Sequence, residues 1–225
     1  MFMKQLTIPE LYNLNETIAG EYMSSAEYPW QLLSNLYYCV VEIGKSLSKD
    51  NFEEVSEHVW IAKSATVAPT AIIEGPCVID ESAEIRHAAF IRGTAIIGKF
   101  AVVGNSTEIK NSILFNWVQV PHFNYIGDSI LGCKVHLGAG AITSNVKADG
   151  TLINVKAGQI FETGLKKVGA MLGDNVEVGC NSVLNPGTVV GRNTIIYPMS
   201  MVRGYVPANS VYKKQGEIAD RISAH

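Results

Sequence analysis

Residues 61–109 read IAKSATVAPTAIIEGPCVIDESAEIRHAAFIRGTAIIGKFAVVGNSTEI, and a bulky apolar residue returns in this stretch at every sixth position. The recurring residues are Ile61, Val67, Ile73, Ile79, Ile85, Ile91, Ile97, Val103 and Ile109, and the spacing continues to Phe115. A second series, four residues after the first, is mostly small: Ala65, Ala71, Cys77, Ala83, Ala89, Ala95, Ala101, Thr107 and Ile113. A period of six fits neither a helix nor an alternating strand, so the stretch predicts a repeat protein.

The repeat breaks near Pro121 and returns further along the chain. It resumes as Leu131 and Leu137, and again as Leu172, Val178, Leu184, Val190, Ile196 and Val202. One bulky and one small inward position in every six residues is typical of a flat face of a parallel β-helix, in which the small residue lies at a corner. Three hexads make one triangular coil, and successive coils stack about 4.8 Å apart. The sequence therefore predicts a mainly β protein with a hexapeptide-repeat parallel β-helix.

The composition excludes several other classes of protein. The chain has 225 residues, of which 47% are hydrophobic and 17% charged, with a net charge of −3. These values favour a packed core over disorder and provide no basic surface for nucleic acid. We find neither an apolar run long enough to span a membrane nor a signal peptide, and we expect a cytoplasmic protein. The cysteines are too far apart in the sequence for a CxxC motif or a zinc knuckle; they are Cys39, Cys77, Cys133 and Cys180.

Other segments surround the repeat. Residues 1–55 lack the hexad and carry two helix starts, at Pro9 and Pro29, so we expect them to form a helical cap on the first coil. Residues 56–203 are predicted to form the β-helix, which residues 146–168 leave as an inserted loop. Residues 204–225 are more polar, and we expect a tail with a short helix from Lys213 to Arg221.

His122 is the leading candidate for a catalytic base. It follows Pro121 at the break in the repeat, where a side chain can leave the wall and face a cleft. Histidine is the residue whose ordinary pKa lies nearest neutral pH, which suits general-base catalysis. The alternative is an exposed histidine at a corner with no chemical role.

Arg92 and Lys110 form the second candidate site. They are one 18-residue coil apart and each directly follows a bulky inward residue, so we expect them side by side, about 5 Å apart. Two cations at that distance repel each other, and a bound phosphate would offset the repulsion. The alternative is neutralisation by a carboxylate, for which Glu108 is near enough.

Two further stretches carry a resemblance to a known family. They are VGNSTEIKNSILFNWVQVPHFNYIGDSILGCKVHLGAGAITSN, residues 103–145, and TGLKKVGAMLGDNVEVGCNSVLNPGTVVG, residues 163–191. They resemble the left-handed β-helix acyltransferase domain of bifunctional UDP-N-acetylglucosamine pyrophosphorylase / glucosamine-1-phosphate acetyltransferases. They are closer still to the archaeal-type sugar-phosphate nucleotidylyltransferases that carry a similar VPH-x-x-Y-x-GDS stretch. The resemblance covers about residues 60–205.

The resemblance implies a fold, a reaction and an assembly. The β-helix would be left-handed, and the reaction would be acyl transfer from acetyl-CoA, as co-substrate, to the amine of a hexosamine-1-phosphate. No tightly bound cofactor and no metal would be needed. The chain would form a homotrimer with the site between subunits. About sixty residues precede the repeat, without a Gly-rich phosphate loop, so we expect no nucleotidyltransferase activity.

The resemblance also implies roles for individual residues. Arg92, Lys110 and Tyr125 would bind the sugar phosphate, and Asn145 would hydrogen-bond the amino sugar near its amine. His136 falls where the family has a sugar-contacting asparagine, and would either contact sugar or face solvent. Ala139 would donate its backbone N–H to the developing oxyanion. The residues expected to bind acyl-CoA are Ala139 and Cys180, together with Lys166 and Lys167, which are equally well explained as a solvated basic pair.

Two functions of other classes remain open. A zinc hydratase like the γ-class carbonic anhydrases needs three histidines, two of them five residues apart, and no HxxxxH pattern occurs in the sequence. A non-catalytic β-helix that binds sugar phosphates, or serves as a scaffold, would carry the same repeat.

Overall fold

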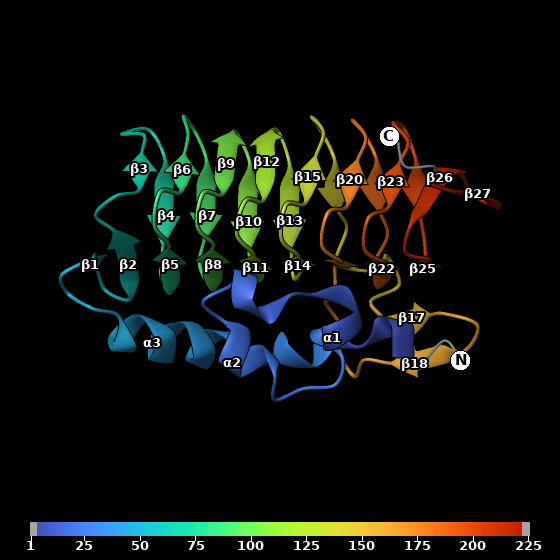
Figure 1. Cartoon of the computed structure of the whole chain (residues 1–225), viewed down its shortest axis with the longest axis horizontal. Coiled ribbons are helices and arrows are strands. Elements are labelled where there is room, and N and C mark those ends of the chain that lie inside the picture. The colour runs from blue at the N-terminus through green and yellow to red at the C-terminus, as the bar shows by residue number, and fades with distance from the viewer. Residues whose placement is uncertain (1–3, 222–225) are drawn as a thin grey trace.

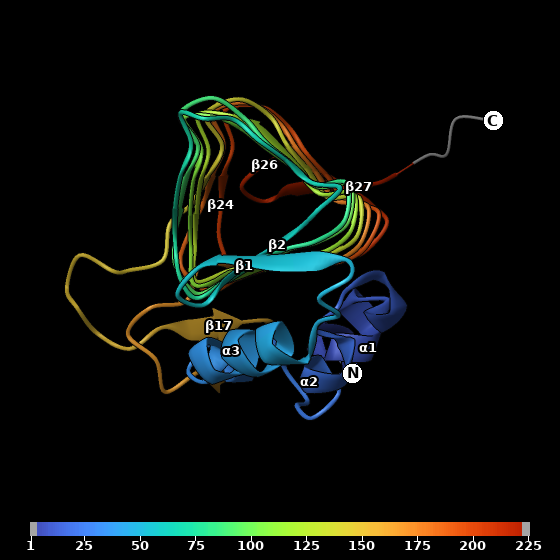
Figure 2. The same cartoon turned by 90° about the vertical axis from the view of Figure 1, so that its left-hand side faces the viewer.

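The computed structural model describes residues 4–221 and shows a left-handed β-helix of about nine coils, with roughly 18 residues in each. Viewed end on, the coils superpose into a triangular prism (Figure 2), and short helices lie along one of its sides (Figure 1). The predicted fold class, a mainly β hexapeptide-repeat solenoid with helices in its N-terminal part, is confirmed.

Three sheets form the sides of the prism. Sheet A contains β1 (Phe52–Ser56), β2 (Val59–Ala62), β5 (Cys77–Ile79), β8 (Ala95–Ile97), β11 (Ser112–Leu114), β14 (Ile130–Leu131), β19 (Ala170–Leu172), β22 (Thr188–Val190) and β25 (Tyr205–Val206). Sheet B contains β3 (Thr66–Val67), β6 (Glu84–Ile85), β9 (Val102–Asn105), β12 (Gln119–His122), β15 (His136–Leu137), β20 (Glu177–Val178), β23 (Ile195–Ile196), β26 (Ser210–Lys214) and β27 (Glu217–Asp220). Sheet C contains β4 (Ile72–Glu74), β7 (Phe90–Arg92), β10 (Glu108–Lys110), β13 (Tyr125–Gly127), β16 (Ile142–Thr143), β21 (Val183–Leu184) and β24 (Met201–Val202). Neighbouring coils pair in parallel, as a β-helix requires.

The bulky residues of the hexad fill the interior, with one correction. Ile61, Ile79 and Ile97 pair at intervals of 18 residues, but the next partner of Ile97 is Leu114, not Phe115. The coil is therefore one residue short between Ile109 and Leu114, and the repeat breaks there rather than near Pro121. Phe115 points out of the prism, where its ring packs at 5.2 Å from that of Tyr12.

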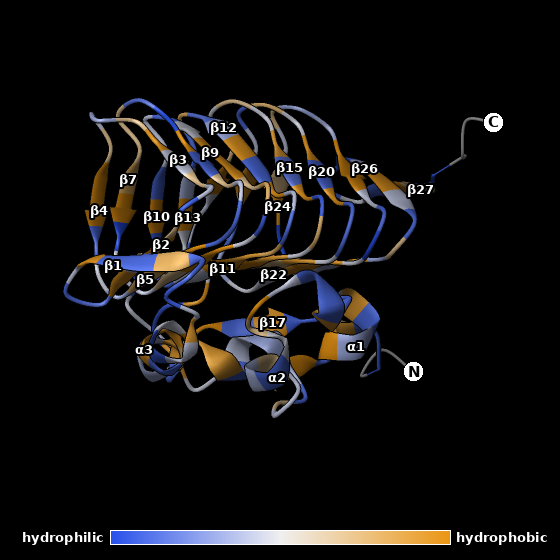
Figure 3. Ribbon diagram, turned by 60° about the vertical axis from the view of Figure 1, so that its left-hand side comes forward, coloured by the Kyte–Doolittle hydropathy of each residue, from blue (hydrophilic) through white to orange (hydrophobic). Residues whose placement is uncertain are grey.

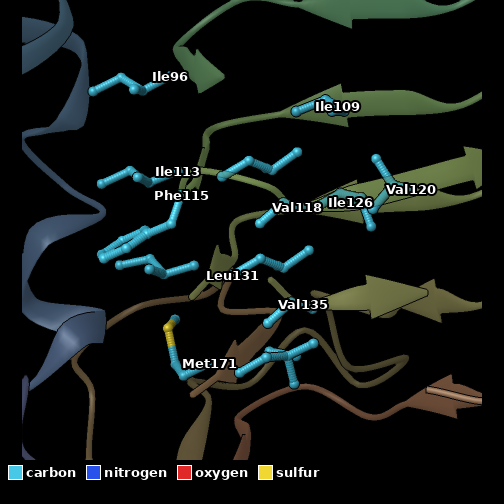
Figure 4. Packing of buried hydrophobic residues seen from close by; sticks show 14 of the residues in the cluster. Ile96, Ile109, Ile113, Phe115, Val118, Val120, Ile126, Leu131, Val135 and Met171 are labelled. Atoms are coloured by element: carbon cyan, nitrogen blue, oxygen red, sulfur yellow. The ribbon is translucent and has the colours of Figure 1, made fainter. Parts of the chain in front are cut away.

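Sheet A is apolar on its outer face as well. The outward residues of its central strands are all buried: Val78, Ile96, Ile113, Ile130, Met171 and Val189. In Figure 4, Ile96, Ile113 and Met171 lie on the side of the helices, whereas Ile109, Val120 and Ile126 lie inside the prism. A sheet with two apolar faces needs a second layer to exclude water from the outer one.

The helices supply this second layer. They are η1 (Lys4–Leu6), α1 (Ile8–Leu11), η2 (Leu14–Glu16), α2 (Gly20–Met23), η3 (Pro29–Leu32) and α3 (Leu36–Ser46). Hydrophobic residues of these helices and of sheet A belong to one core, and Figure 3 shows the two layers stacked along the prism. The prediction of a cap on the first coil is therefore wrong in placement, because the helices cover a side of the solenoid and not its end. No helix within residues 4–221 is long and apolar enough to cross a membrane.

Polar contacts anchor this layer to coils far along the chain. The hydroxyl of Tyr12 donates to the carbonyl oxygen of Ile130, and the Asn13 N–H donates to Asp174 Oδ2 at 2.8 Å. Arg192 Nη2 lies 3.3 Å from the same carboxyl oxygen of Asp174. Burial raises the pKa of Asp174, and these partners offset the cost of its charge.

The inserted segment is only partly a loop. It first leaves the prism, as the yellow loop in Figure 2 shows, and then folds back as a hairpin of β17 (Asn154–Lys156) and β18 (Ile160–Glu162). Phe161 of the hairpin packs against Tyr28 and Trp30 of the helical layer. The hairpin thus belongs to the second layer, and the loop before it stays exposed.

The predicted C-terminal helix is wrong. Residues 210–220 form an antiparallel hairpin of β26 and β27, which turns at Gly216 with a φ of 81°. The inward hexad continues here, since Tyr212 pairs with Ile196 and is almost fully buried. The period of six therefore overrides the helical propensity of the polar tail. Residues 222–225 of that predicted tail lie outside the described residues.

The covered face predicts a measurable difference between two isoleucines. Ile113→Ala should lower the free energy of unfolding by about 2–5 kcal/mol, because Ile113 points outward yet is fully buried under the helices. Ile218→Ala is the matched control on β27 of the C-terminal hairpin, where Ile218 is 44% exposed, and should cost within about 0.5 kcal/mol. Urea unfolding of both variants provides the comparison, and equally small losses would mean that the helices do not cover sheet A.

Candidate functional site at the two edges of sheet C

Two corners of the prism flank sheet C. The B–C corner precedes its strands and carries His122–Asn124 and Gly138–Ala141, whereas the C–A corner follows them and carries Asn111, Asp128 and Asn145. Strand β13 connects the corners, so three strand residues, each rising about 3.3 Å, separate His122–Asn124 from Asp128. Every predicted catalytic residue lies at one of these corners.

His122 ends β12 with an exposed side chain. Its imidazole makes no hydrogen bond with any residue from 4 to 221, so both ring nitrogens are available to a substrate. Its backbone carbonyl accepts a hydrogen bond from the Gly140 N–H at 3.0 Å. Because the hexad spacing is regular on both sides of His122, the residue lies on the regular wall and not at a break in it, contrary to the prediction.

Asn124 fixes the B–C corner from inside the prism. Its amide nitrogen donates to the carbonyl oxygens of Gly138 and Ala141, at 2.9 and 3.2 Å, and its side-chain oxygen accepts from the His122 N–H. Asn124 is 2% exposed, so these contacts hold the backbone of His122 against the following turn. Asn124 is not among the residues that the sequence predicted for the site. The sequence could have indicated this role, because Asn124 lies four residues after the inward Val120, at a corner position that usually holds a small residue.

Ala139 and Cys180 follow His122 along the same corner. Among residues 4–221 the Ala139 N–H finds no hydrogen-bond acceptor, while its carbonyl accepts from the Asn181 N–H. A Cβ placed on Gly138 would lie 2.7 Å from the Cys180 nitrogen, so glycine permits the close approach of these coils. The structure therefore brings His122, Ala139 and the exposed Cys180 into one column of successive coils.

Asp128 is the centre of the C–A corner. Its Oδ1 accepts from the Asn111 amide at 2.8 Å and its Oδ2 accepts from the Asn145 amide. Lys110 Nζ lies 3.7 Å from the same Oδ2. The carboxylate is almost fully buried, and hydrogen bonds to charged groups are the stronger ones, so Asp128 orients both Lys110 and Asn145. The sequence motif contained Asp128, but its contacts with Asn111, Asn145 and Lys110 were not predicted.

Arg92 and Lys110 lie side by side, as predicted. Ile91 pairs with Ile109, which places the residues that follow them in adjacent coils on one outer face. Arg92 Nη1 forms an ion pair with Glu108 Oε1 at 2.9 Å, which raises the pKa of the guanidinium. The neutralising carboxylate that we considered as an alternative is therefore present for Arg92, and Asp128 takes that place for Lys110.

Tyr125 lies on sheet C beside this pair. Its hydroxyl oxygen accepts a hydrogen bond from the Asn145 amide at 3.2 Å. A Cβ on Gly127 would come within 2.6 Å of the Tyr125 hydroxyl oxygen, so Gly127 leaves the space that the ring occupies. Burial raises the pKa of Tyr125, which keeps the hydroxyl protonated and able to donate at neutral pH.

The side chains of three predicted residues form no hydrogen bond or ion pair with the clusters at either corner within residues 4–221. His136 is on the outer face of sheet B, where its Nδ1 is 2.9 Å from Glu177 Oε2. Lys166 and Lys167 are exposed and follow the hairpin. The next residue, Val168, donates its backbone N–H to the Asn145 carbonyl. Within one chain the structure thus separates these lysines from Ala139 and Cys180 by the width of sheet C. No three His, Cys, Asp or Glu side chains of residues 4–221 are close enough together to hold a metal ion.

Comparison with known proteins identifies the family. The sequence profile of the GMPPB C-terminal domain matches residues 73–189, just over half of the chain. The chain belongs to this family. The resemblance to β-helix acyltransferase domains is confirmed by its relatives, and the chain is a hexapeptide β-helix domain similar to the C-terminal part of GlmU.

Individual relatives show the extent of the similarity. The bifunctional protein GlmU of Methanococcus maripaludis (strain DSM 14266) is 35% identical over 198 residues, which are 86% of this chain and 48% of the relative. The bifunctional sugar-1-phosphate nucleotidylyltransferase/acetyltransferase of Sulfurisphaera tokodaii is 34% identical over 110 residues, 48% of this chain and 27% of the relative. This chain thus spans about half the length of these relatives or less.

A solved structure gives a more distant match. The acetyltransferase domain of PglB from Neisseria gonorrhoeae, in complex with acetyl coenzyme A, is 17% identical over 68% of this chain and 53% of that chain, with a TM-score of 0.27.

Asn124 provides a test of how the B–C corner is held. Asn124→Ala should cost about 1–3 kcal/mol of unfolding free energy, because it removes the side-chain donor to the buried Ala141 carbonyl and leaves the Gly138 carbonyl with the Ala141 N–H as its donor. Asn105→Ala is the control in the preceding coil and should cost within about 0.5 kcal/mol, since within residues 4–221 the Asn105 side chain makes a single hydrogen bond, which it accepts from the Ser106 hydroxyl. If thermal unfolding finds the two variants alike, the corner does not depend on Asn124.

Proposed function

We propose that the chain is an acyl-CoA-dependent N-acyltransferase that acetylates the amine of a hexosamine-1-phosphate. One observation supports the proposal most strongly. The His122 imidazole and the Ala139 N–H, which have no hydrogen-bond partner within residues 4–221, lie at one edge of sheet C, and the cations Arg92 and Lys110 lie at the other edge. Relatives named GlmU and a nucleotidylyltransferase/acetyltransferase support the same reaction class.

In the proposed mechanism His122 is the general base. It removes a proton from the substrate's ammonium group, and the resulting amine attacks the thioester carbonyl of acetyl-CoA. The carbonyl oxygen becomes an oxyanion, to which the Ala139 N–H donates. Collapse of this intermediate breaks the C–S bond and the imidazolium gives its proton to the departing thiolate. The attacking nitrogen loses its second proton to solvent, so that a neutral amide, the CoA thiol and one released proton result. Asn145, oriented by Asp128, hydrogen-bonds the amino sugar near its amine.

Arg92, Lys110 and Tyr125 would bind the phosphate. A guanidinium has five N–H donors in a fork, so the single contact of Arg92 with Glu108 leaves donors for a phosphate. The ammonium of Lys110 has three donors, and its 3.7 Å separation from Asp128 leaves them available. The protonated Tyr125 hydroxyl, which accepts from Asn145, donates its own hydrogen.

We further propose that the chain assembles as a homotrimer with closed symmetry. Sheet A is covered by helices, so sheets B and C remain for contacts between subunits. Sheet C and the B–C corner expose apolar side chains, with Ile72 60%, Met199 76% and Met201 53% exposed. A neighbouring subunit on this face would bring a C–A corner, with Asn145, Lys166 and Lys167, toward His122 and the acyl-CoA that it faces.

His122→Ala should lower kcat by about 10²–10⁴-fold, the usual contribution of a general base. The His122 side chain is exposed and makes no hydrogen bond within residues 4–221, so unfolding should stay within about 0.5 kcal/mol of the parent chain. Thiol release from acetyl-CoA in the presence of hexosamine-1-phosphates measures the rate. His136→Ala is the control. It removes a histidine from the outer face of sheet B, and its rate of thiol release should equal that of the parent chain. A chain that binds hexosamine-1-phosphate without releasing thiol would be a non-catalytic binding protein, which contradicts the proposal.

The trimer is tested by light scattering. The expected mass is three times the 24.4 kDa of one chain. Met199→Asp combined with Met201→Asp should reduce the mass to that of a single chain while the far-UV circular dichroism is unchanged, because both side chains are exposed in one chain. A parent chain that is monomeric at micromolar concentration would rule out both the trimer and the shared site.

A further inference from the structure

A cleft of about 510 Å³ lies at the C–A corner, several coils beyond the Arg92–Lys110 pair. The loop that begins the insert forms one wall, strand β17 forms the floor, and the corners after β21 and β24 form the other wall. The residues that determine its chemistry are Lys147, Asp149, Asn154, Lys156, Asn185 and Arg203.

The cleft is positively charged. Lys156 and Arg203 form no ion pair with any residue from 4 to 221, and Lys147 Nζ is held by the carbonyl oxygen of Leu152 at 2.6 Å. Asp149 is the carboxylate in the lining, and both of its contacts are with Thr151. Those hydrogen bonds lower the pKa of Asp149, so it stays ionised. Three cations against one carboxylate leave a net charge of about +2 in a concave site, which concentrates anions.

Close backbone packing fixes the floor of the cleft. A Cβ on Gly204 would lie 2.9 Å from the Lys156 carbonyl oxygen, and one on Gly187 would lie 2.9 Å from that of Asn154. Both glycines have a positive φ, 78° and 75°. Strand β17 can therefore lie directly against the corner, which places Lys156 beside Arg203 before any ligand binds.

This cleft is separate from the proposed sugar-phosphate site. Lys110 pairs with Gly127, and the paired strands that follow place Ser144, Asn185 and Arg203 in the same column. Arg203 is thus four coils from Lys110, about 19 Å at the strand spacing of about 4.8 Å. One phosphate group cannot contact both.

We propose that the cleft is a second anion site, which binds the phosphates of a nucleotide-sized ligand. Its volume falls within the range of small-molecule pockets, and the guanidinium fork of Arg203 matches phosphate oxygens. The amides of Asn154 and Asn185 provide hydrogen bonds for a base or sugar, and Val146 and Pro186 provide apolar contact. The nucleotide of acyl-CoA and that of a nucleotide sugar share this chemistry. As a site for the nucleotide of acyl-CoA the proposal rests on the proposed acyl transfer, whereas as a site for a nucleotide sugar it goes beyond that reaction.

Equilibrium binding to the full chain tests the site without any turnover. The probes are CoA, 3′-dephospho-CoA and UDP, and the variant carries Lys156→Gln and Arg203→Gln. Each lost cation should weaken binding on the order of ten-fold, the usual effect of removing a charge-assisted hydrogen bond. A matched control removes the same charge with Lys49→Gln and Lys134→Gln, two exposed lysines outside the cleft, and should bind as the parent chain does.

The pattern of losses identifies the ligand. A loss for CoA but not for 3′-dephospho-CoA assigns the cleft to the 3′-phosphate of the acyl donor, and equal losses for both assign it to the pyrophosphate that they share. A loss for UDP alone assigns it to a nucleotide sugar. Equal binding by the variant, its control and the parent chain would overturn the proposal, as would a parent chain that binds none of the three probes.

Discussion

The inward apolar column of the prism sets the position of every group on its surface. Each coil places one bulky side chain per sheet against its counterpart in the next coil, and the strand spacing of about 4.8 Å follows from their pairing. Residues that occupy equivalent positions in successive coils are therefore close in space and far apart in sequence. Arg92 with Lys110, and His122 with Ala139, are placed in this way, so the site is part of a rigid wall and not of a mobile loop.

Departures from the six-residue spacing are confined to one corner in the described coils. The paired inward residues show steps of five residues from Ile109 to Leu114 and from Ile126 to Leu131, and a step of four from Val202 to Val206. The insert separates Thr143 from Leu172. All of these lie at the C–A corner, which also holds Asn111, Asp128 and Asn145. At this corner the Asn111 and Asn145 amides donate to the Asp128 carboxylate, which also lies 3.7 Å from Lys110 Nζ.

The sequence predicted the solenoid because its six-residue period depends on local spacing alone. It also predicted that Arg92 and Lys110 would be neighbours, since one coil separates them. The placement of the helices was missed because it depends on the outer face of sheet A. That face was visible as apolar pairs such as Val78-Ile79 and Ile96-Ile97, in which both faces of the strand are hydrophobic. The roles of Asp128 and Asn124 were missed because they arise from side-chain contacts between coils. The spacing of residues in one sequence does not say which of these contacts form. Phe115 was misplaced because one shortened corner shifts every later residue.

In the proposed reaction, sheet C positions a sugar phosphate at one edge and directs its amine toward a catalytic imidazole. A crystal structure with CoA and glucosamine-1-phosphate tests this arrangement most directly. We predict a phosphate within hydrogen-bond distance of both Arg92 and Lys110, an amine within reach of a His122 imidazole, and the thiol of CoA beside the Ala139 N–H. A sugar phosphate bound away from sheet C, with Arg92 still paired to Glu108 and His122 facing solvent, would contradict it.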